Sequence, residues 1–357
     1  MLFPYGRIRH RMRAMHGFIS YIFSRVWCRA PNVEYSIELF DALPSLYSIM
    51  NDLYLKDLAG VDTGAGAFFY RYINEIFLEF KNLTPAQIAS YRKMFMDNND
   101  IQALCEGKKE PTRYPDAPDS VLMGKIENFF SKLYSGGFFD LAVVKKNIGT
   151  DLREHYKAFA EFNGMPCCPF CGLMPMDSEF DPSREAYDHY LPSSKYPFNS
   201  VNLKNLAPSC YKCNSQSKGA KDPLLNDAGV RTKAFYPYLS SKYPIKVSVH
   251  FKNPHQLPVV ADDISITLDC AGHEEEVETW DRLYKVRTRY AAKCLSVGAK
   301  YWLQRVLEEK DNYNLASQDL LTKELDTCKD FPWHDTNFLK NAFLVESLKT
   351  SLIKIRV

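Results

Sequence analysis

The chain has 357 residues, a formal net charge of +2, 46% hydrophobic residues and 25% charged residues. This length allows two or three domains, and the composition excludes an intrinsically disordered protein. The near-neutral charge excludes a protein that coats nucleic acid along its whole surface, so any affinity for phosphate must come from a local patch.

The first 32 residues are basic at their start. Arginines occupy alternate positions from Arg7 to Arg13, and a short apolar run follows from Phe18 to Phe23. Ser20 interrupts this run and Arg25 ends it, so the run is too short to cross a membrane and lacks a signal-peptide cleavage site. We therefore expect residues 1–32 to form a basic tail or helix of a cytoplasmic protein without a membrane segment.

Residues 33–162 have the spacing of amphipathic helices. Apolar residues recur at three- and four-residue intervals, as between Phe68 and Phe80, which predicts helices that pack on one another. Thr84 followed by Pro85 is typical of a helix N-terminus, with the threonine as cap and the proline in the first turn. The same spacing predicts further helices over 121–134 and 151–162.

Two Cys-x-x-Cys pairs, Cys168 with Cys171 and Cys210 with Cys213, frame the most informative segment of the chain. This spacing lets two thiolates from one tight turn bind one side of a tetrahedral Zn²⁺ ion. Four thiolates complete the coordination shell, so the predicted zinc is structural and has no open position for a substrate. The other six of the ten cysteines are scattered, which favours a reducing compartment over a disulfide framework.

Polar residues that suit phosphodiester hydrolysis lie within and beside the cysteine pairs: Asp188, His189, Asn205 and Asn214. His189 can accept the proton of water near neutral pH, because an unperturbed histidine has a pKa of about 6.5. We therefore assign His189 as the general base. Asp188 offers the hard oxygen ligand that Mg²⁺ or Mn²⁺ prefers.

A run of lysines coincides with these residues. No Asp or Glu occurs between His189 and Lys221. This stretch carries Lys195, Lys204, Lys212, Lys218 and Lys221. Such charge runs often only solvate a surface, but the position of this one beside a metal motif favours contact with phosphate.

Residues 231–357 predict a small α+β domain. Residues 246–251 and 264–268 have the β-branched or alternating pattern of strands in one small sheet. Residues 280–307 predict one long amphipathic helix, and residues 337–353 predict another.

The motifs DHYLP, NL, CYKCN and KG, taken in this order and spacing, resemble the HNH endonucleases over about residues 165–225. The resemblance implies a ββα-metal unit, in which two short antiparallel strands and a helix hold one divalent cation. DHYLP, KYPF and CNSQSKG are most similar to HNH proteins of bacterial anti-phage defence, including the nuclease subunit of Septu systems.

The resemblance implies a role for each motif residue. Asp188 and Asn214 are expected to bind the catalytic Mg²⁺ or Mn²⁺ ion, and Asn205 is expected to hold the His189 loop or ring. Lys218 replaces the third metal ligand of some relatives, and an ammonium group cannot bind a cation. Together with Lys212 and Lys221, it is therefore assigned to phosphate contacts. The implied partners are a DNA substrate and an ATPase subunit.

These observations lead to one preferred hypothesis and leave three alternatives. We expect an α+β, mostly α-helical protein with an N-terminal tail or helix (1–32), a helical domain (33–162), an HNH nuclease domain (163–230) and a C-terminal α+β domain (231–357). The alternatives are an RNA-cleaving nuclease, a DNA nuclease that acts without a partner, and a noncatalytic four-cysteine zinc adaptor that binds nucleic acid or protein.

Overall fold

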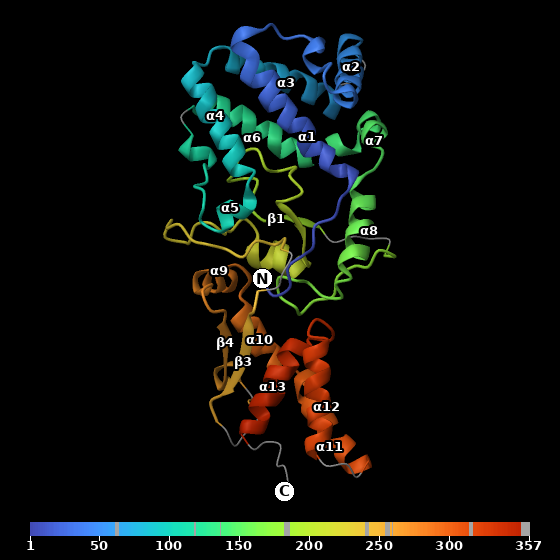
Figure 1. The fold of residues 1–357 in the computed structure, drawn as a ribbon, viewed down its shortest axis with the longest axis vertical. Coiled ribbons are helices and arrows are strands. Elements are labelled where there is room, and N and C mark those ends of the chain that lie inside the picture. The colour runs from blue at the N-terminus through green and yellow to red at the C-terminus, as the bar shows by residue number, and fades with distance from the viewer. Residues whose placement is uncertain are drawn as a thin grey trace.

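The computed structural model describes residues 1–60, 64–117, 119–135, 137–181, 186–239, 243–253, 258, 260–313 and 317–350. Over these ranges the protein is mostly helical and has two small two-stranded sheets, which confirms the predicted fold class. It is elongated, with the first helices at one end, the cysteine-rich segment in the middle and the last helices at the other end (Figure 1). Within the described ranges, no helix has the length and apolar character needed to cross a bilayer.

The N-terminal half is a helical bundle, as the apolar spacing predicts. Its elements are η1 (Arg11–Arg13), α1 (Ala14–Tyr21), η2 (Ile22–Val26), η3 (Trp27–Asn32), η4 (Ile37–Phe40), α2 (Pro44–Leu58), α3 (Ala65–Lys81), α4 (Pro85–Asn98), α5 (Ile101–Cys105), η5 (Tyr114–Asp116), α6 (Ser120–Ser135), η6 (Phe138–Asp140), α7 (Ala142–Ile148) and α8 (Leu152–Asn163). The expected cap of α4 is present as a capping box between Thr84 and Gln87. Aromatic side chains fill the centre, where the fully buried Trp27 donates a hydrogen bond to the Ile73 carbonyl at 3.0 Å.

Residues 1–5 form an extended segment that packs against the middle of the molecule. The backbone N–H of Leu2 donates to Pro169 O at 3.0 Å, and that of Tyr5 donates to Pro237 O at 2.8 Å. The Tyr5 hydroxyl donates to Pro208 O at 2.8 Å. The basic stretch from Arg7 onward therefore starts beside the cysteine-rich segment before the chain enters the helical bundle at Arg11.

The middle of the molecule contains a short hairpin followed by a helical turn, the order that the HNH resemblance implies. Strand β1 (Tyr187–His189) pairs antiparallel with β2 (Leu206–Pro208), and Asp188 lies opposite Ala207. The π-helix η7 (Lys212–Lys218) follows. The register between the two strands is regular, so Asp188 and His189 project from opposite faces of β1.

The loop between β1 and β2 inserts into the helical bundle. Phe198 is fully buried with a left-handed backbone (φ 76°), and its ring contacts Phe23, Phe95 and Phe130 at centroid distances of 5.2, 5.4 and 5.5 Å. The Ser200 hydroxyl donates to Phe130 O at 2.8 Å. The strain of a left-handed phenylalanine is tolerated because aromatic packing holds the ring in place.

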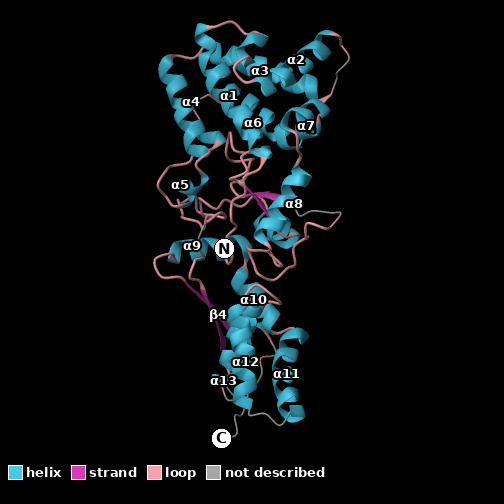
Figure 2. Cartoon of the chain, turned by 45° about the vertical axis from the view of Figure 1, so that its right-hand side comes forward, coloured by secondary structure: helices cyan, strands magenta, loops and turns pink. Residues whose placement is uncertain are grey.

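The described residues of the C-terminal part form a β-hairpin followed by α-helices (Figure 2). Its elements are β3 (Lys246–Phe251), η8 (Ala261–Asp263), β4 (Ile264–Asp269), α9 (Glu274–Tyr284), α10 (Val286–Cys294), α11 (Val297–Tyr313), α12 (Ser317–Asp330) and α13 (Asn337–Lys349). Both predicted strands are confirmed, and β3 pairs antiparallel with β4. The predicted helix over 337–353 is present from Asn337 to Lys349, and residues 351–353 lie outside the described part.

The single long helix predicted over 280–307 is wrong. Helix α9 ends at Tyr284 because Lys285 adopts a left-handed conformation (φ 52°), and the chain then restarts as α10. Asp281 supports this turn, since its Oδ1 accepts the backbone N–H of Arg287 at 2.8 Å. A left-handed lysine has no sequence signature comparable to glycine, so the apolar spacing alone could not reveal the break.

Candidate functional site

The four predicted zinc ligands form one buried cluster. Cys168, Cys171, Cys210 and Cys213 are at most 3% exposed, and their Sγ atoms all lie within 4.8 Å of one another. A tetrahedral site with Zn–S bonds of about 2.3 Å separates its sulfurs by about 3.8 Å, so the cluster has the size and donor chemistry of a Zn²⁺ site. Cys167 lies outside the cluster, in an isolated bridge with Pro175.

Each cysteine pair sits in a tight turn whose backbone is fixed by hydrogen bonds. In the first turn, Gly172 N donates to Cys168 O at 2.6 Å, and Gly172 has a left-handed backbone (φ 67°). In the second turn, Cys213 N donates to Cys210 O at 2.9 Å. These turns hold each pair of thiols on one side of the cluster.

The C-terminal helices surround this cluster with side chains that the sequence did not indicate. The Arg289 guanidinium lies 3.2 Å from Cys213 Sγ, where it offsets part of the charge of about −2 that a Zn²⁺ ion with four thiolates carries. Trp280 donates to Phe170 O at 2.7 Å, and Tyr290 donates to Cys171 O at 2.9 Å. The cluster therefore joins the hairpin to α9 and α10.

Asp188 forms a buried ion pair with Lys218. Lys218 Nζ lies 2.8 Å from Asp188 Oδ1, and the two side chains are 3% and 1% exposed, respectively for Asp188 and Lys218. The ammonium group also donates to His189 O at 2.8 Å and to Gly219 O at 3.4 Å, which satisfies its three protons. Burial raises the pKa of Asp188, and the Lys218 charge opposes this rise. A phosphate contact from Lys218 would therefore require its ammonium group to leave Asp188.

His189 lies at the end of β1 with its ring on the face opposite Asp188. Its Nε2 lies 2.8 Å from Ser200 O, and its ring packs edge-on against Tyr134 of α6 at a centroid distance of 4.5 Å. A carbonyl oxygen only accepts hydrogen bonds, so Nε2 carries the ring proton and Nδ1 carries the lone pair. Burial lowers the pKa of His189 to about 4, which keeps the ring neutral at pH 7. Among the described residues, no hydrogen bond engages Nδ1.

Asn205 fixes the chain that follows His189. It is fully buried, its Oδ1 accepts from Leu191 N at 2.7 Å, and its Nδ2 donates to Leu191 O at 3.0 Å. Nδ2 also donates to Asn199 Oδ1 at 3.2 Å, in the loop that supplies Ser200 O to the His189 ring. Asn205 therefore holds the loop after His189 without touching the ring.

Asn214 lies one turn before Lys218 on η7, so both residues belong to the same face of that helix. Its backbone N–H donates to Cys210 O at 2.9 Å, and the described part of the chain offers no hydrogen bond to its side chain. Of the other predicted phosphate contacts, Lys212 is exposed and Lys221 is partly buried. Lys218 thus contacts both the Asp188 carboxylate and the His189 carbonyl, and Asn214 lies near them because it belongs to the same helix as Lys218.

The two predicted ligands of the catalytic metal ion fit a hard cation in type. Asp188 Oδ2 is buried and has no hydrogen-bond partner among the described residues. Together with the side-chain oxygen of Asn214, it gives the oxygen donors that Mg²⁺ or Mn²⁺ prefers. The positive charge of Lys218 repels a metal ion from the Asp188 carboxylate. We therefore expect weak metal binding by these residues until a phosphate group adds negative charge.

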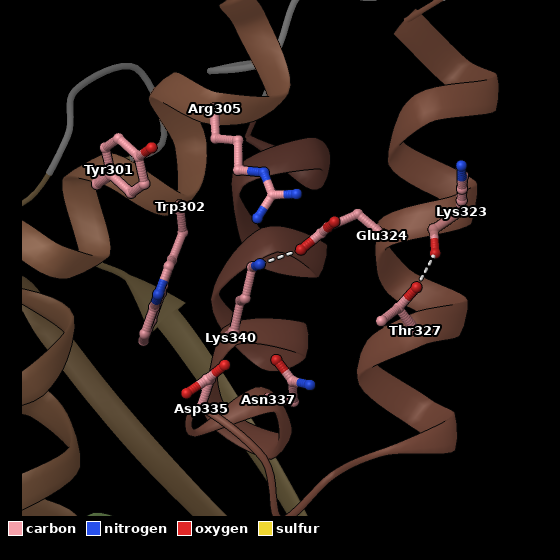
Figure 3. A pocket seen from close by; sticks show the side chains of 9 residues that line it. All are labelled: Tyr301, Trp302, Arg305, Lys323, Glu324, Thr327, Asp335, Asn337 and Lys340. Atoms are coloured by element: carbon pink, nitrogen blue, oxygen red, sulfur yellow. Dashed lines mark hydrogen bonds and ion pairs between the residues drawn. The ribbon is translucent and has the colours of Figure 1, made fainter. Parts of the chain in front are cut away.

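A cavity of about 460 Å³ lies among α11, α12 and α13, and none of the predicted site residues lines it (Figure 3). Lys340 in its wall forms an ion pair with Glu324. Thr327 donates to Lys323 O at 2.9 Å, and Asn337 donates to Phe331 O at 3.0 Å. Several polar side chains of this cavity are therefore engaged in the packing of the helices themselves.

The comparisons with known proteins show a distant similarity. The chain is 26% identical over 195 residues to protein ea31 of Escherichia phage lambda, and the aligned region covers 54% of this chain and 56% of the phage protein. The chain thus matches about half the length of this curated relative. No family model and no solved structure matches the chain.

Proposed function

We propose that this protein is a metal-dependent endonuclease of the HNH type that hydrolyses DNA phosphodiester bonds, with the four-cysteine cluster holding a structural zinc ion. The observation that carries the proposal is the state of His189. Its Nε2–H is engaged by Ser200 O, its ring is neutral at pH 7, and it belongs to the same short hairpin as Asp188. A neutral imidazole with one accepting nitrogen is what a general base for water requires.

His189 would take the proton of the attacking water on Nδ1 while Ser200 O keeps the ring in place. The free protein disfavours the charged ring, because burial lowers the His189 pKa and the Lys218 charge acts in the same direction. A bound phosphate group brings negative charge close to the ring and raises this pKa toward neutrality. The base would therefore reach its working strength when substrate is present.

A divalent cation held by the oxygens of Asp188 and Asn214 would supply positive charge for the phosphate and the leaving oxygen. Asp188 and His189 project from opposite faces of β1, and His189 is the last residue of this strand, so the phosphate group would have to lie at the strand end to meet both the base and the cation.

The test is cleavage of plasmid and oligonucleotide DNA with Mg²⁺ or Mn²⁺, and with EDTA as a control. We expect His189→Ala to lower the cleavage rate at least about 100-fold, with the zinc content and the circular dichroism spectrum unchanged. His250→Ala is the matched control, because His250 is an exposed histidine on β3. Equal cleavage by wild type and His189→Ala would contradict the assignment of the general base.

The buried Lys218–Asp188 pair favours a second candidate, a noncatalytic four-cysteine module that binds nucleic acid or protein. Lys218 neutralises the Asp188 carboxylate, and every proton of its ammonium group is already engaged. This candidate predicts nucleic-acid binding without cleavage under any metal condition. Parallel reactions with RNA and DNA of the same sequence separate an RNA nuclease from a DNA nuclease.

The resemblance to anti-phage HNH nucleases extends the proposal to defence against phage together with an ATPase subunit. The protein's near-neutral charge supports a partner that brings it to DNA, since its overall electrostatic attraction to phosphate is weak. Co-purification of an ATPase with the protein from its native host is the expected result. Full cleavage activity of the isolated chain would favour the nuclease that acts alone.

A further inference from the structure

A cavity of about 240 Å³ lies between the basic N-terminal stretch and the β1–β2 hairpin. It is lined by Arg7, Ile8, Arg9, Arg13, His155, Phe159, Leu203, Lys204 and Tyr238. These residues come from the segment before α1, from α8, from the loop before β2 and from the chain after η7. The cavity is therefore assembled from four parts of the sequence.

Among the described residues, the lining carries four positive side chains and no acidic one. Arg9, Arg13 and Lys204 are exposed, and the described part of the chain gives none of them an ion pair. Arg7 is held in place, because its Nη2 donates to Gln102 Oε1 at 3.1 Å and its guanidinium lies 5.3 Å from the centre of the Tyr236 ring. Such a concentration of unpaired positive charge attracts phosphate.

One wall of the cavity is apolar. Phe159 and Tyr238, which form this wall, are at most 5% exposed. The volume suits a phosphodiester group with a few waters, since one water takes up about 30 Å³ of liquid. It lies below the range of about 300–1,000 Å³ that is usual for drug-sized ligands.

The cavity is tied to the strand that carries His189. His155 in the cavity wall hydrogen-bonds through Nδ1 to the hydroxyl of Tyr187. Tyr187 and His189 lie two residues apart on the same face of β1, a separation of about 7 Å along the strand. A nucleic-acid strand repeats its phosphates every few ångströms, so one strand can reach both places.

We propose that this cavity is a phosphate-binding subsite that holds the backbone of the DNA substrate beside the scissile bond. The proposal rests on the proposed nuclease function for its ligand. Arg9, Arg13 and Lys204 supply the charge, and Arg7 provides a guanidinium already fixed in position. His155 adds a neutral polar ring to the wall, because burial lowers its pKa to about 4.

The test compares Arg9→Gln/Arg13→Gln with wild type for binding of a fluorescent DNA oligonucleotide, in EDTA and across a series of salt concentrations. Removing two phosphate contacts should reduce the slope of log Kd against log salt by about 1 to 2 and weaken binding about 10-fold at low salt. Arg25→Gln/Arg29→Gln is the matched control. It removes two exposed arginines from the helical run η2–η3, away from this cavity, and should leave binding unchanged.

Cleavage kinetics give the second readout: the cavity variant should have a raised KM with kcat close to wild type. An unchanged salt slope would overturn the subsite, as would an equal loss in the Arg25/Arg29 control. His189→Ala should bind like wild type. Binding that depends on the cavity arginines, in a wild-type protein that never cleaves, would sustain the subsite and refute the nuclease. Cleavage by the cavity variant with the KM of the wild type would sustain the nuclease and refute the subsite.

Discussion

Replacing Lys218 by methionine removes the positive partner of a buried carboxylate while keeping a long side chain. In the native protein the ammonium group bonds to Asp188 Oδ1 and His189 O, and Asp188 Oδ2 already has no hydrogen-bond partner among the described residues. Lys218→Met would leave both oxygens of this buried carboxylate unpaired. Breaking such a pair from one side costs about 3–5 kcal/mol, which is a large part of the stability of an ordinary domain.

The double-mutant cycle measures the ion pair itself. Asp188→Asn and Lys218→Met are each expected to destabilise the protein strongly, whereas the double variant should recover part of the loss, with a coupling energy of about 2–3 kcal/mol. The assay is urea unfolding of zinc-saturated protein followed by circular dichroism. A coupling energy of about 0.2–1 kcal/mol, as for exposed pairs, would refute the buried geometry on which this reasoning depends.

The same variant should show a characteristic pH dependence. Burial raises the Asp188 pKa and Lys218 opposes the rise, so Lys218→Met should raise this pKa further. A carboxyl group whose pKa is raised in the folded protein binds a proton more readily there than in the unfolded chain, and acidification then favours the folded state. The destabilisation of Lys218→Met should therefore shrink as the pH falls through the raised pKa. A penalty that stays constant from pH 8 to pH 4 would contradict this cause.

Three further outcomes follow from the same structure. Elemental analysis of the wild type should give about one zinc ion per chain, and Cys213→Ser should lower this zinc content and make unfolding insensitive to chelator. Asn205→Ala should cost about 3 kcal/mol in urea unfolding, because the N–H and C=O of Leu191 lose their side-chain partner; a loss below about 1 kcal/mol would speak against it. Burial lowers the pKa of His155 to about 4, so the unfolded chain binds protons more readily at this residue and stability should fall as the pH drops from about 6.5 to 4. His155→Phe should remove the part of this acid loss that comes from His155, while His16 and His189 keep theirs.

Short-range patterns predicted much of the architecture. The helix cap at Thr84, the strands over 246–251 and 264–268 and the cysteine cluster were all evident from the sequence. Each depends on residues whose spacing is set by one turn, one strand or one metal ion. The helical N-terminal half follows from apolar periodicity for the same reason.

Features that depend on distant contacts were not evident. Lys218 stands where the HNH resemblance suggested a phosphate contact, but its side chain turns inward to Asp188, 30 residues earlier. Ser200 O orients the His189 ring, and a backbone acceptor leaves no trace in residue type. The sequence did not indicate that the arginines between Arg7 and Arg13 line a cavity with α8 and the hairpin, because only the fold brings these segments together.

The left-handed Phe198 bears on any attempt to use the cysteine-rich segment as a portable cassette. Its ring packs against Phe23, Phe95 and Phe130 of the helical bundle, and two residues later the same loop provides Ser200 O as the acceptor for His189. A fragment limited to residues 165–225 would retain the four thiols but lose these three aromatic partners, and the His189 ring would then be free to rotate. Grafts and minimal versions of this protein should therefore include the helical bundle, because the bundle fixes the loop that orients His189.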